Sequence, residues 1–179
     1  TGPLDGNRFN ITLSYTTDIQ FSNVNYYTLI LDYRRYFRLS PLIAIAARVE
    51  FLMNEGKEAR RWVMGGSWDL RGWPRFSIRG KKLWLASTEL RFPLVNLFAV
   101  HFPLGIHFDF PYIRGAVFFD AGNAWDKEYE ETRGSVGVGA RINLFNILAL
   151  RYDFGKRIEN NFKKFQSGFF HQFFFGWDF

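Results

Sequence analysis

Apolar and polar side chains alternate residue by residue along most of this 179-residue chain. In the final segment, for example, Phe173, Phe175 and Trp177 are separated from one another by single residues. Successive side chains of a β-strand point to opposite faces of a sheet, so this alternation indicates strands with one apolar and one polar face. The pattern predicts eight strands, at residues 8–16, 24–38, 42–53, 82–92, 112–125, 134–144, 148–155 and 168–179.

The amino-acid composition helps to decide whether such strands lie in water or in a membrane. Hydrophobic residues make up 47% of the chain and aromatic residues 20%, yet mean hydropathy is only −0.15. The aromatic content argues against disorder, and the absence of cysteine excludes a disulfide or zinc–thiolate scaffold. No segment approaches the roughly 18 uncharged apolar residues of a membrane-spanning helix. Because strands cross a bilayer only where every backbone group is paired, the sequence predicts an all-β fold, an antiparallel transmembrane β-barrel.

The connections between the predicted strands are of two kinds. Short turns are predicted at residues 39–41 and 145–146, and long loops at residues 54–81, 126–133 and 157–166. In outer-membrane barrels the short turns face the periplasm and the long loops face outward. We therefore expect residues 1–179 to form one outer-membrane barrel domain of eight strands, with a long external loop at 54–81.

Several other functions are disfavoured by the spacing of particular residues. The net charge of +6 is carried by basic residues that are scattered singly, so we expect no nucleic-acid partner. Glycines recur at every second position in residues 134–139, as on one face of a strand, whereas a phosphate-binding loop has irregularly placed glycines. The three histidines are too scattered for a metal site, and no nucleophile can be assigned a base. We therefore expect no enzyme activity, no metal and no cofactor.

Five motifs occur in an order that matches a known family. They are GGSWDLRGW at residues 65–73, ELRFP at 89–93, GAVFFDAGNAW at 115–125, GSVGVG at 134–139 and an aromatic last strand that ends at Phe179. Their order and spacing resemble the C-terminal half of the BamA/TamA-type outer-membrane assembly barrels of the bacterial surface antigen superfamily. The resemblance covers nearly the whole chain.

This resemblance implies a sixteen-stranded barrel, to which the chain contributes the equivalent of the last eight strands. It also implies that the sixth external loop folds back into the lumen and contacts the wall through an arginine. In this sequence the loop motif is Leu70, Arg71, Gly72 and Trp73, and the lumen-wall partners of Arg71 are Asp120 and Glu89. A guanidinium binds a carboxylate in bidentate fashion, and glycine permits a sharp turn beside it.

Two further sets of residues follow from the same resemblance. Where the loop approaches the wall, small side chains are expected to leave room for it, namely at Ser135, Gly137 and Gly139. Aromatic residues at the end of the last strand are expected to act as a signal for the assembly machinery of the cell, namely Phe175, Trp177 and Phe179.

By this resemblance the protein lies in the outer membrane of a Gram-negative type of bacterium, and it inserts or translocates other proteins. Its partners would be outer-membrane lipid, unfolded outer-membrane or secreted proteins, and a second barrel half or another copy of the chain. An alternative is a passive membrane anchor for a soluble enzyme or binding domain upstream. A soluble β-sandwich that binds a partner is a third interpretation.

Eight strands leave two arrangements open. The chain is either half of a larger barrel or a barrel that closes alone. A closed eight-stranded barrel is filled by its own side chains, so the 28 residues of loop 54–81 would then have to stay outside. The first residues, Thr1 to Asn7, contain no apolar or basic targeting segment, and we expect a mature product or an excised fragment.

Overall fold

The computed structural model describes residues 4–21, 23–95, 99–101, 107–109, 113–144 and 148–177. Its principal element is a nine-stranded antiparallel sheet in the order β1-β2-β3-β6-β9-β10-β11-β12, with β13 also paired to β11. The strands are β1 (Gly6–Thr17), β2 (Asn25–Arg38), β3 (Ala44–Lys57), β6 (Lys82–Val95), β9 (Ile113–Trp125), β10 (Arg133–Leu144), β11 (Leu148–Glu159), β12 (Lys164–Phe165) and β13 (Phe170–Trp177). The predicted all-β antiparallel fold is confirmed. Within the described part of the chain, no helix is long and apolar enough to cross a membrane.

Each of the eight predicted strands has a counterpart in this sheet, and five of them are longer than predicted, with β3 and β11 continuing furthest past their predicted ends. β3 continues past residue 53 to Lys57, which pairs with Asn25 of β2. β11 continues past residue 155 to Glu159, and Ile158 near its end pairs with Gly134 of β10. Backbone pairing with the neighbouring strand maintains these ends although their side chains no longer alternate. The predicted loop 54–81 therefore begins inside β3.

Besides β12, which falls in the predicted loop 157–166, four strands of three residues lie within segments that the alternation leaves as connections. β4 (Trp62–Met64) pairs with β5 (Ile78–Gly80) inside loop 54–81, and β7 (Ala99–His101) pairs with β8 (His107–Asp109). Three residues are too few for alternation to be recognised in a sequence. The short turn predicted at residues 145–146 lies outside the described residues.

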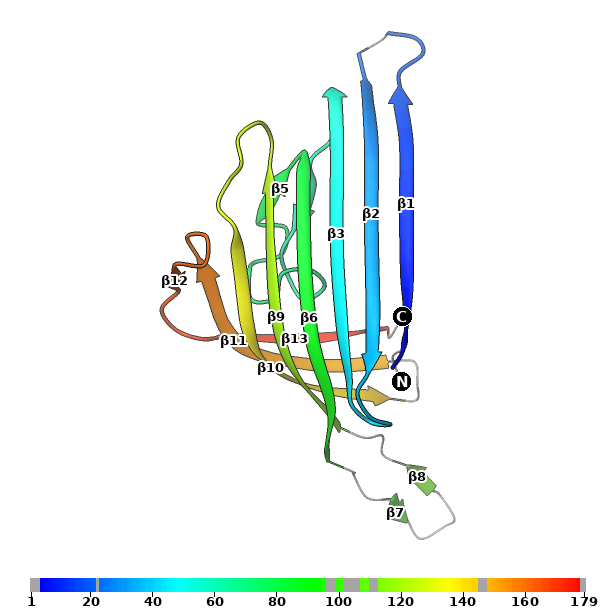
Figure 1. Ribbon diagram of the computed structural model, residues 1–179, viewed down its shortest axis with the longest axis vertical. Coiled ribbons are helices and arrows are strands. Elements are labelled where there is room, and N and C mark those ends of the chain that lie inside the picture. The colour runs from blue at the N-terminus through cyan, green and yellow to red at the C-terminus, as the bar shows by residue number, and fades with distance from the viewer. Residues whose placement is uncertain are drawn as a thin grey trace.

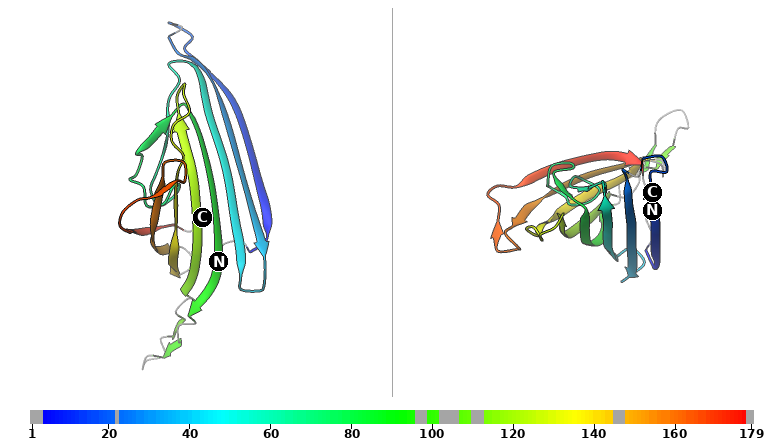
Figure 2. Two further views of the ribbon diagram at one scale, coloured as in Figure 1. Left: turned by 60° about the vertical axis from the view of Figure 1, so that its left-hand side comes forward. Right: turned by 90° about the horizontal axis from the view of Figure 1, so that it is seen from above.

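The sheet is strongly curved, and the segment between β3 and β6 lies on its concave side (Figures 1 and 2). The beginning of β1 and the end of β13 lie near each other in all three views, but the two strands diverge from there. No backbone pairing joins β1 to β13 in the part of the chain that the structure describes. The sheet is therefore open, and eight strands closed on themselves with the loop outside is not the arrangement found. The loop occupies the space that such a closure would eliminate.

The loop is held over the sheet by an apolar cluster as well as by polar contacts. Loop residues and wall residues of β3, β6 and β9 contribute to this cluster, which consists of Leu52, Met64, Leu70, Ile78, Leu83, Leu85 and Ala124. Leu70 of the predicted loop motif is completely buried in it. Full burial of a leucine side chain contributes about 1.5–3 kcal/mol. Leu70 thus anchors the segment that carries the next residue, Arg71.

Candidate functional site

Strand register places the predicted wall residues in adjacent rows. Asp120 of β9 pairs with Ser87 of β6 on one side and with Ser135 of β10 on the other. Two residues along each strand, a second row consists of Glu89, Phe118 and Gly137. Side chains two residues apart on a strand share a face, so both rows belong to one surface. Asp120 is completely buried and Glu89 is 5% exposed, although both are on the face opposite the apolar one.

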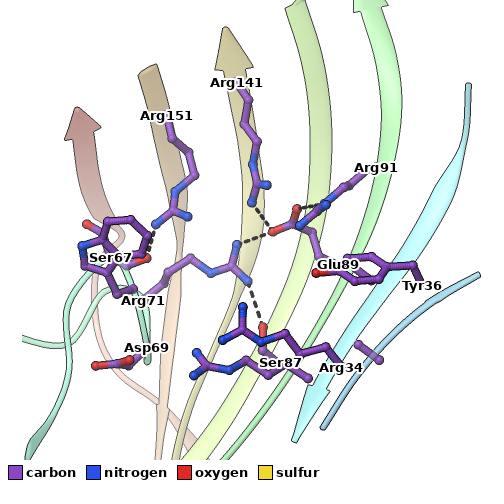
Figure 3. A pocket seen from close by; sticks show the side chains of 14 residues that line it. Arg34, Tyr36, Ser67, Asp69, Arg71, Ser87, Glu89, Arg91, Arg141 and Arg151 are labelled. Carbon is purple, nitrogen blue, oxygen red and sulfur yellow. Dashed lines mark hydrogen bonds and ion pairs between the residues drawn. The ribbon is translucent and has the colours of Figure 1, made fainter. Parts of the chain in front are cut away.

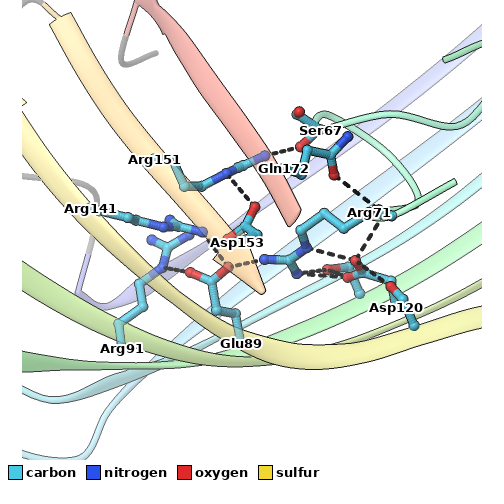
Figure 4. Close-up of polar contacts among 12 residues, drawn as sticks. Ser67, Arg71, Glu89, Arg91, Asp120, Arg141, Arg151, Asp153 and Gln172 are labelled. Atoms are coloured by element: carbon cyan, nitrogen blue, oxygen red, sulfur yellow. Dashed lines mark hydrogen bonds and ion pairs between the residues drawn. The ribbon is translucent and has the colours of Figure 1, made fainter. Parts of the chain in front are cut away.

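Arg71 extends from the loop onto this surface and contacts both carboxylates (Figure 4). Its Nε donates to Asp120 Oδ2 at 2.6 Å and its Nη2 to Asp120 Oδ1 at 2.7 Å, which is a bidentate arrangement. Its Nη1 donates to Glu89 Oε2 at 2.8 Å. The guanidinium carbon also lies 3.7 Å from the centre of the Phe118 ring. The structure thus brings together the three charged residues that the sequence analysis assigned to this contact.

The electrostatics of the contact keep the Arg71 guanidinium charged inside the protein. Arg71 is only 4% exposed, and burial by itself would lower the pKa of its guanidinium. The hydrogen bonds and charge of Asp120, together with the charge of Glu89, outweigh burial and raise the pKa of Arg71 above its ordinary value. Glu89 is shared further, since it also accepts from Arg91 Nε at 2.8 Å and from Arg141. Hydroxyl groups of Ser87 and Ser135 donate to Asp120.

The two residues after Arg71 attach the loop to the last strands. Gly72 has a φ of +82°, and its N–H donates to Gln172 Oε1 of β13 at 2.9 Å. Its carbonyl accepts from Arg157 Nε of β11 at 2.5 Å. A Cβ at this position would overlap the Phe170 ring, so glycine is needed for both conformation and space. Trp73 Nε1 donates to the carbonyl of Gly134 at 2.9 Å.

The surroundings of the small wall residues differ from one another. Ser135 donates to Asp120, whereas the atoms nearest to a Cβ built on Gly137 or Gly139 belong to other wall residues. A Cβ on Gly137 would meet the backbone of β11 and the Phe118 ring, and a Cβ on Gly139 would meet the Asp153 carboxylate. The glycines therefore make room for neighbouring wall side chains. Gly137 supports the Arg71 contact indirectly, because the Phe118 ring that it admits lies against the guanidinium.

A cavity of about 150 Å³ lies beside Arg71 on the same polar face (Figure 3). Five more arginines line it, namely Arg34, Arg48, Arg91, Arg141 and Arg151. Each of the five forms an ion pair, with partners drawn from Asp32, Glu50, Glu89 and Asp153. Such alternating charge can hold water and stiffen the wall. Among the described residues, no group of three His, Cys, Asp or Glu side chains could hold a metal ion.

The predicted C-terminal signal residues are not part of this site. Phe175 pairs with Leu150 and its side chain is 58% exposed on the other face. The backbone of Trp177 pairs with Leu148, but its side chain and the whole of Phe179 lie outside the described residues. Phe174, which precedes Phe175 and lies on the opposite face, packs edge-on against Trp68 of the loop, with ring centres 4.6 Å apart.

Sequence reasoning missed four residues that complete the loop contact: Ser87, Phe118, Arg157 and Gln172. A signal for them existed, because Ser87 and Phe118 lie two residues from Glu89 and Asp120 and therefore on the same face. For Arg157 and Gln172 the alternation predicts only that a side chain faces the loop side. Which part of the loop each one meets depends on how the loop folds.

Asp69, two residues before Arg71, should make loop docking depend on pH. Burial raises the pKa of its carboxyl above the ordinary 3.8, with a further increase from Asp120 and a decrease from Arg48. A folded-state pKa above the unfolded one favours docking below pH 3.8, and this contribution is lost as pH rises through the folded value. We expect Asp69→Asn to protect the amides of residues 65–73 from hydrogen exchange better than wild type near pH 7, and equally at acidic pH. Equal protection at pH 7 would contradict this assignment.

An antiparallel sheet whose strands have one apolar and one polar face is typical of the wall of an outer-membrane β-barrel. The sequence profile of the Omp85 superfamily domain matches residues 2–179, and the chain belongs to this superfamily. The superfamily consists of bacterial outer-membrane proteins that insert or transport proteins, and its members are not enzymes. No curated protein matches the sequence.

Proposed function

We propose that the chain is the wall and lumen loop of a BamA/TamA-type barrel that inserts proteins into, or translocates them across, the outer membrane. In this proposal residues 1–179 form one barrel domain, equivalent to the last eight strands of sixteen, and loop 54–81 enters from outside. The observation that carries the proposal is the buried contact of Arg71 with Asp120 and Glu89. It joins an external-loop segment to the concave wall, where a transported chain would have to pass.

The loop would act as a reversible latch without covalent chemistry. When docked, it covers the wall through one charged contact, one apolar cluster and the hydrogen bonds of Gly72. When displaced, it exposes polar groups that water can solvate in the lumen, so the release of Arg71 costs less than it would in a dry protein core. Clients would be unfolded outer-membrane or secreted proteins, and Phe175, Trp177 and Phe179 would serve as the signal for the chain's own assembly.

Locking the loop tests this proposal. Cysteines at Trp68 and Phe174, whose rings touch, can be joined by a short bismaleimide linker that contains a cleavable disulfide. Residues 1–179 contain no cysteine, so within them only the two introduced thiols can react. In the full-length protein in cells, we expect cross-linking to reduce client insertion or secretion at least tenfold, and reductant to restore it. Each single-cysteine variant treated with the same reagent is the matched control.

The passive-anchor alternative makes the opposite prediction for this experiment. A permanently docked loop would leave the display of an upstream soluble domain unaffected, because an anchor needs no movement in its lumen. Undiminished client transport with the loop cross-linked would therefore overturn the latch and favour the anchor. The observation that favours the passive anchor is the large number of contacts that hold the loop. These contacts reach β6, β9, β10, β11 and β13.

A further inference from the structure

The convex face of the sheet carries a groove close to the connection between β11 and β13. Its volume is about 360 Å³, and it lies over the outward side of β9, β10 and β11. Apart from backbone and one charged side chain, its lining is apolar: Val117, Val136, Val138, Phe154, Phe165 and Phe169. The rings of Phe154 and Phe169 are stacked with centres 4.8 Å apart. The groove is therefore a narrow aromatic and aliphatic channel on the face proposed to meet lipid.

Lys156 is the single charged residue of this groove. Its ammonium lies 4.8 Å from the centre of the Phe169 ring, and no carboxylate of the described residues forms an ion pair with it. A cation–π contact compensates only part of the cost of an ammonium in apolar surroundings. An ionisable side chain on a membrane-facing wall is rare and usually has a function, with a partner that neutralises it. We therefore expect an anion from outside the chain to bind the ammonium of Lys156.

The turn that borders the groove is held in an unusual conformation. Asn160, Asn161 and Phe162 have φ values of 55°, 52° and 66°, a left-handed run that is unfavourable for residues other than glycine. Two contacts maintain it: the N–H of Thr132 donates to Asn161 Oδ1 at 2.9 Å, and Phe162 stacks on Phe119. The turn is thus folded back against the convex face, and it holds the following Phe165 at the edge of the groove.

We propose that this groove binds one anionic lipid, with an acyl chain along the apolar lining and the lipid phosphate at Lys156. The inference rests on the membrane location proposed above. Charge complementarity supports this occupant, because an unpaired ammonium stands at one side of an otherwise apolar channel. A lysine stem can lie along apolar surface while its ammonium reaches the headgroup level. Lys163 on the adjoining turn is exposed and adds positive charge at the same rim, whereas Lys164 of β12 is paired with Glu159.

Native mass spectrometry of the full-length protein in detergent tests the proposal. The probes are phosphatidylglycerol, phosphatidylcholine with identical acyl chains, and glycerol phosphate as a headgroup without a chain. One lysine near a lipid headgroup contributes about a fivefold preference. We expect wild type to bind one phosphatidylglycerol about fivefold more tightly than phosphatidylcholine, and to bind glycerol phosphate too weakly to compete.

Four variants separate the charge from the groove. Lys156→Gln should bind both lipids equally, and Lys156→Arg should keep the preference. Val138→Trp, which fills the channel, should weaken both lipids, whereas Lys127→Gln, an exposed lysine on another turn, should behave as wild type. An unchanged preference in Lys156→Gln, or displacement of the lipid by glycerol phosphate, would overturn the proposal. If the wild-type protein enters neither micelles nor bilayers, the proposed membrane location fails instead, so the two failures are distinguishable.

Discussion

Replacing Arg71 by alanine is expected to destabilise the docked loop by about 3–5 kcal/mol, the usual cost of removing one partner of a buried ion pair. Asp120 is completely buried, and without the guanidinium it would accept only from the hydroxyl groups of Ser87 and Ser135 and from the backbone N–H of residue 71. Hydrogen exchange of the loop amides in the lipid-reconstituted protein measures the effect. Arg61→Ala is the matched control, because the Arg61–Asp126 pair is exposed and such pairs contribute about 0–1 kcal/mol. Equal effects of the two substitutions would contradict the buried latch.

Double variants distinguish the latch from general disruption. Arg71→Ala and Asp120→Ala should be strongly non-additive, because each alone leaves an uncompensated charge and the pair leaves none between them. The charge swap of Arg71→Asp with Asp120→Arg should restore little. A carboxylate at position 71 would approach Glu89, which now accepts a hydrogen bond from Arg71 at 2.8 Å. A swap that recovered wild-type exchange would mean that Glu89 is not part of the contact.

Placing arginine at Leu90 is expected to cost about 2–4 kcal/mol if this position meets the bilayer midplane. Leu90 lies near the middle of β6, between Ile45 and Val117 on the neighbouring strands, and is 37% exposed on the convex face. Equilibrium urea unfolding from lipid vesicles measures the change in free energy of unfolding. The cost arises because a guanidinium at this depth must be dehydrated or must draw water into the membrane.

Leu39→Arg is the control for this experiment, since Leu39 is exposed in the short turn between β2 and β3. Close to the membrane surface the same arginine should cost only about 0–1 kcal/mol. A large difference between positions 90 and 39 supports a membrane around the convex face. Equal and small costs would place that face in water, and would favour the soluble β-sandwich over the barrel.

The sheet was largely predictable from the sequence because lipid-facing and lumen-facing positions impose a period of two. Glu89, Asp120 and Ser135 were placed on the correct face for this reason. Their alignment into rows depends on the register between strands, which no single strand encodes in its own residues. Which strands pair with the free edges of β1 and β13 also depends on long-range contacts. The closure of the barrel therefore cannot be predicted from the residues of these two strands.

The loop contact was predictable only through the resemblance to a known family. Loop 54–81 has no periodicity, so nothing in its spacing distinguishes Arg71 from other arginines of the loop, such as Arg75. Phe118 shares a face with Asp120 by alternation, but its contact with the Arg71 guanidinium depends on how the loop folds and could not be predicted from the strand alone. The neighbours of Gly137 and Gly139 across the wall, Phe118 and Asp153, could not be predicted because they depend on the register between strands.

The polar contacts of Arg71 and Gly72 reach only forward along the chain, and this sets an order for their formation during biogenesis. Arg71 contacts residues 18 and 49 positions later, and Gly72 contacts Gln172, 100 positions later. During synthesis, none of these partners is beside the loop until the later strands have emerged and paired. Contacts between such distant segments also form slowly, because chain entropy opposes them. The loop must therefore wait undocked while the wall is built, and its docking reports that the final strand is in place.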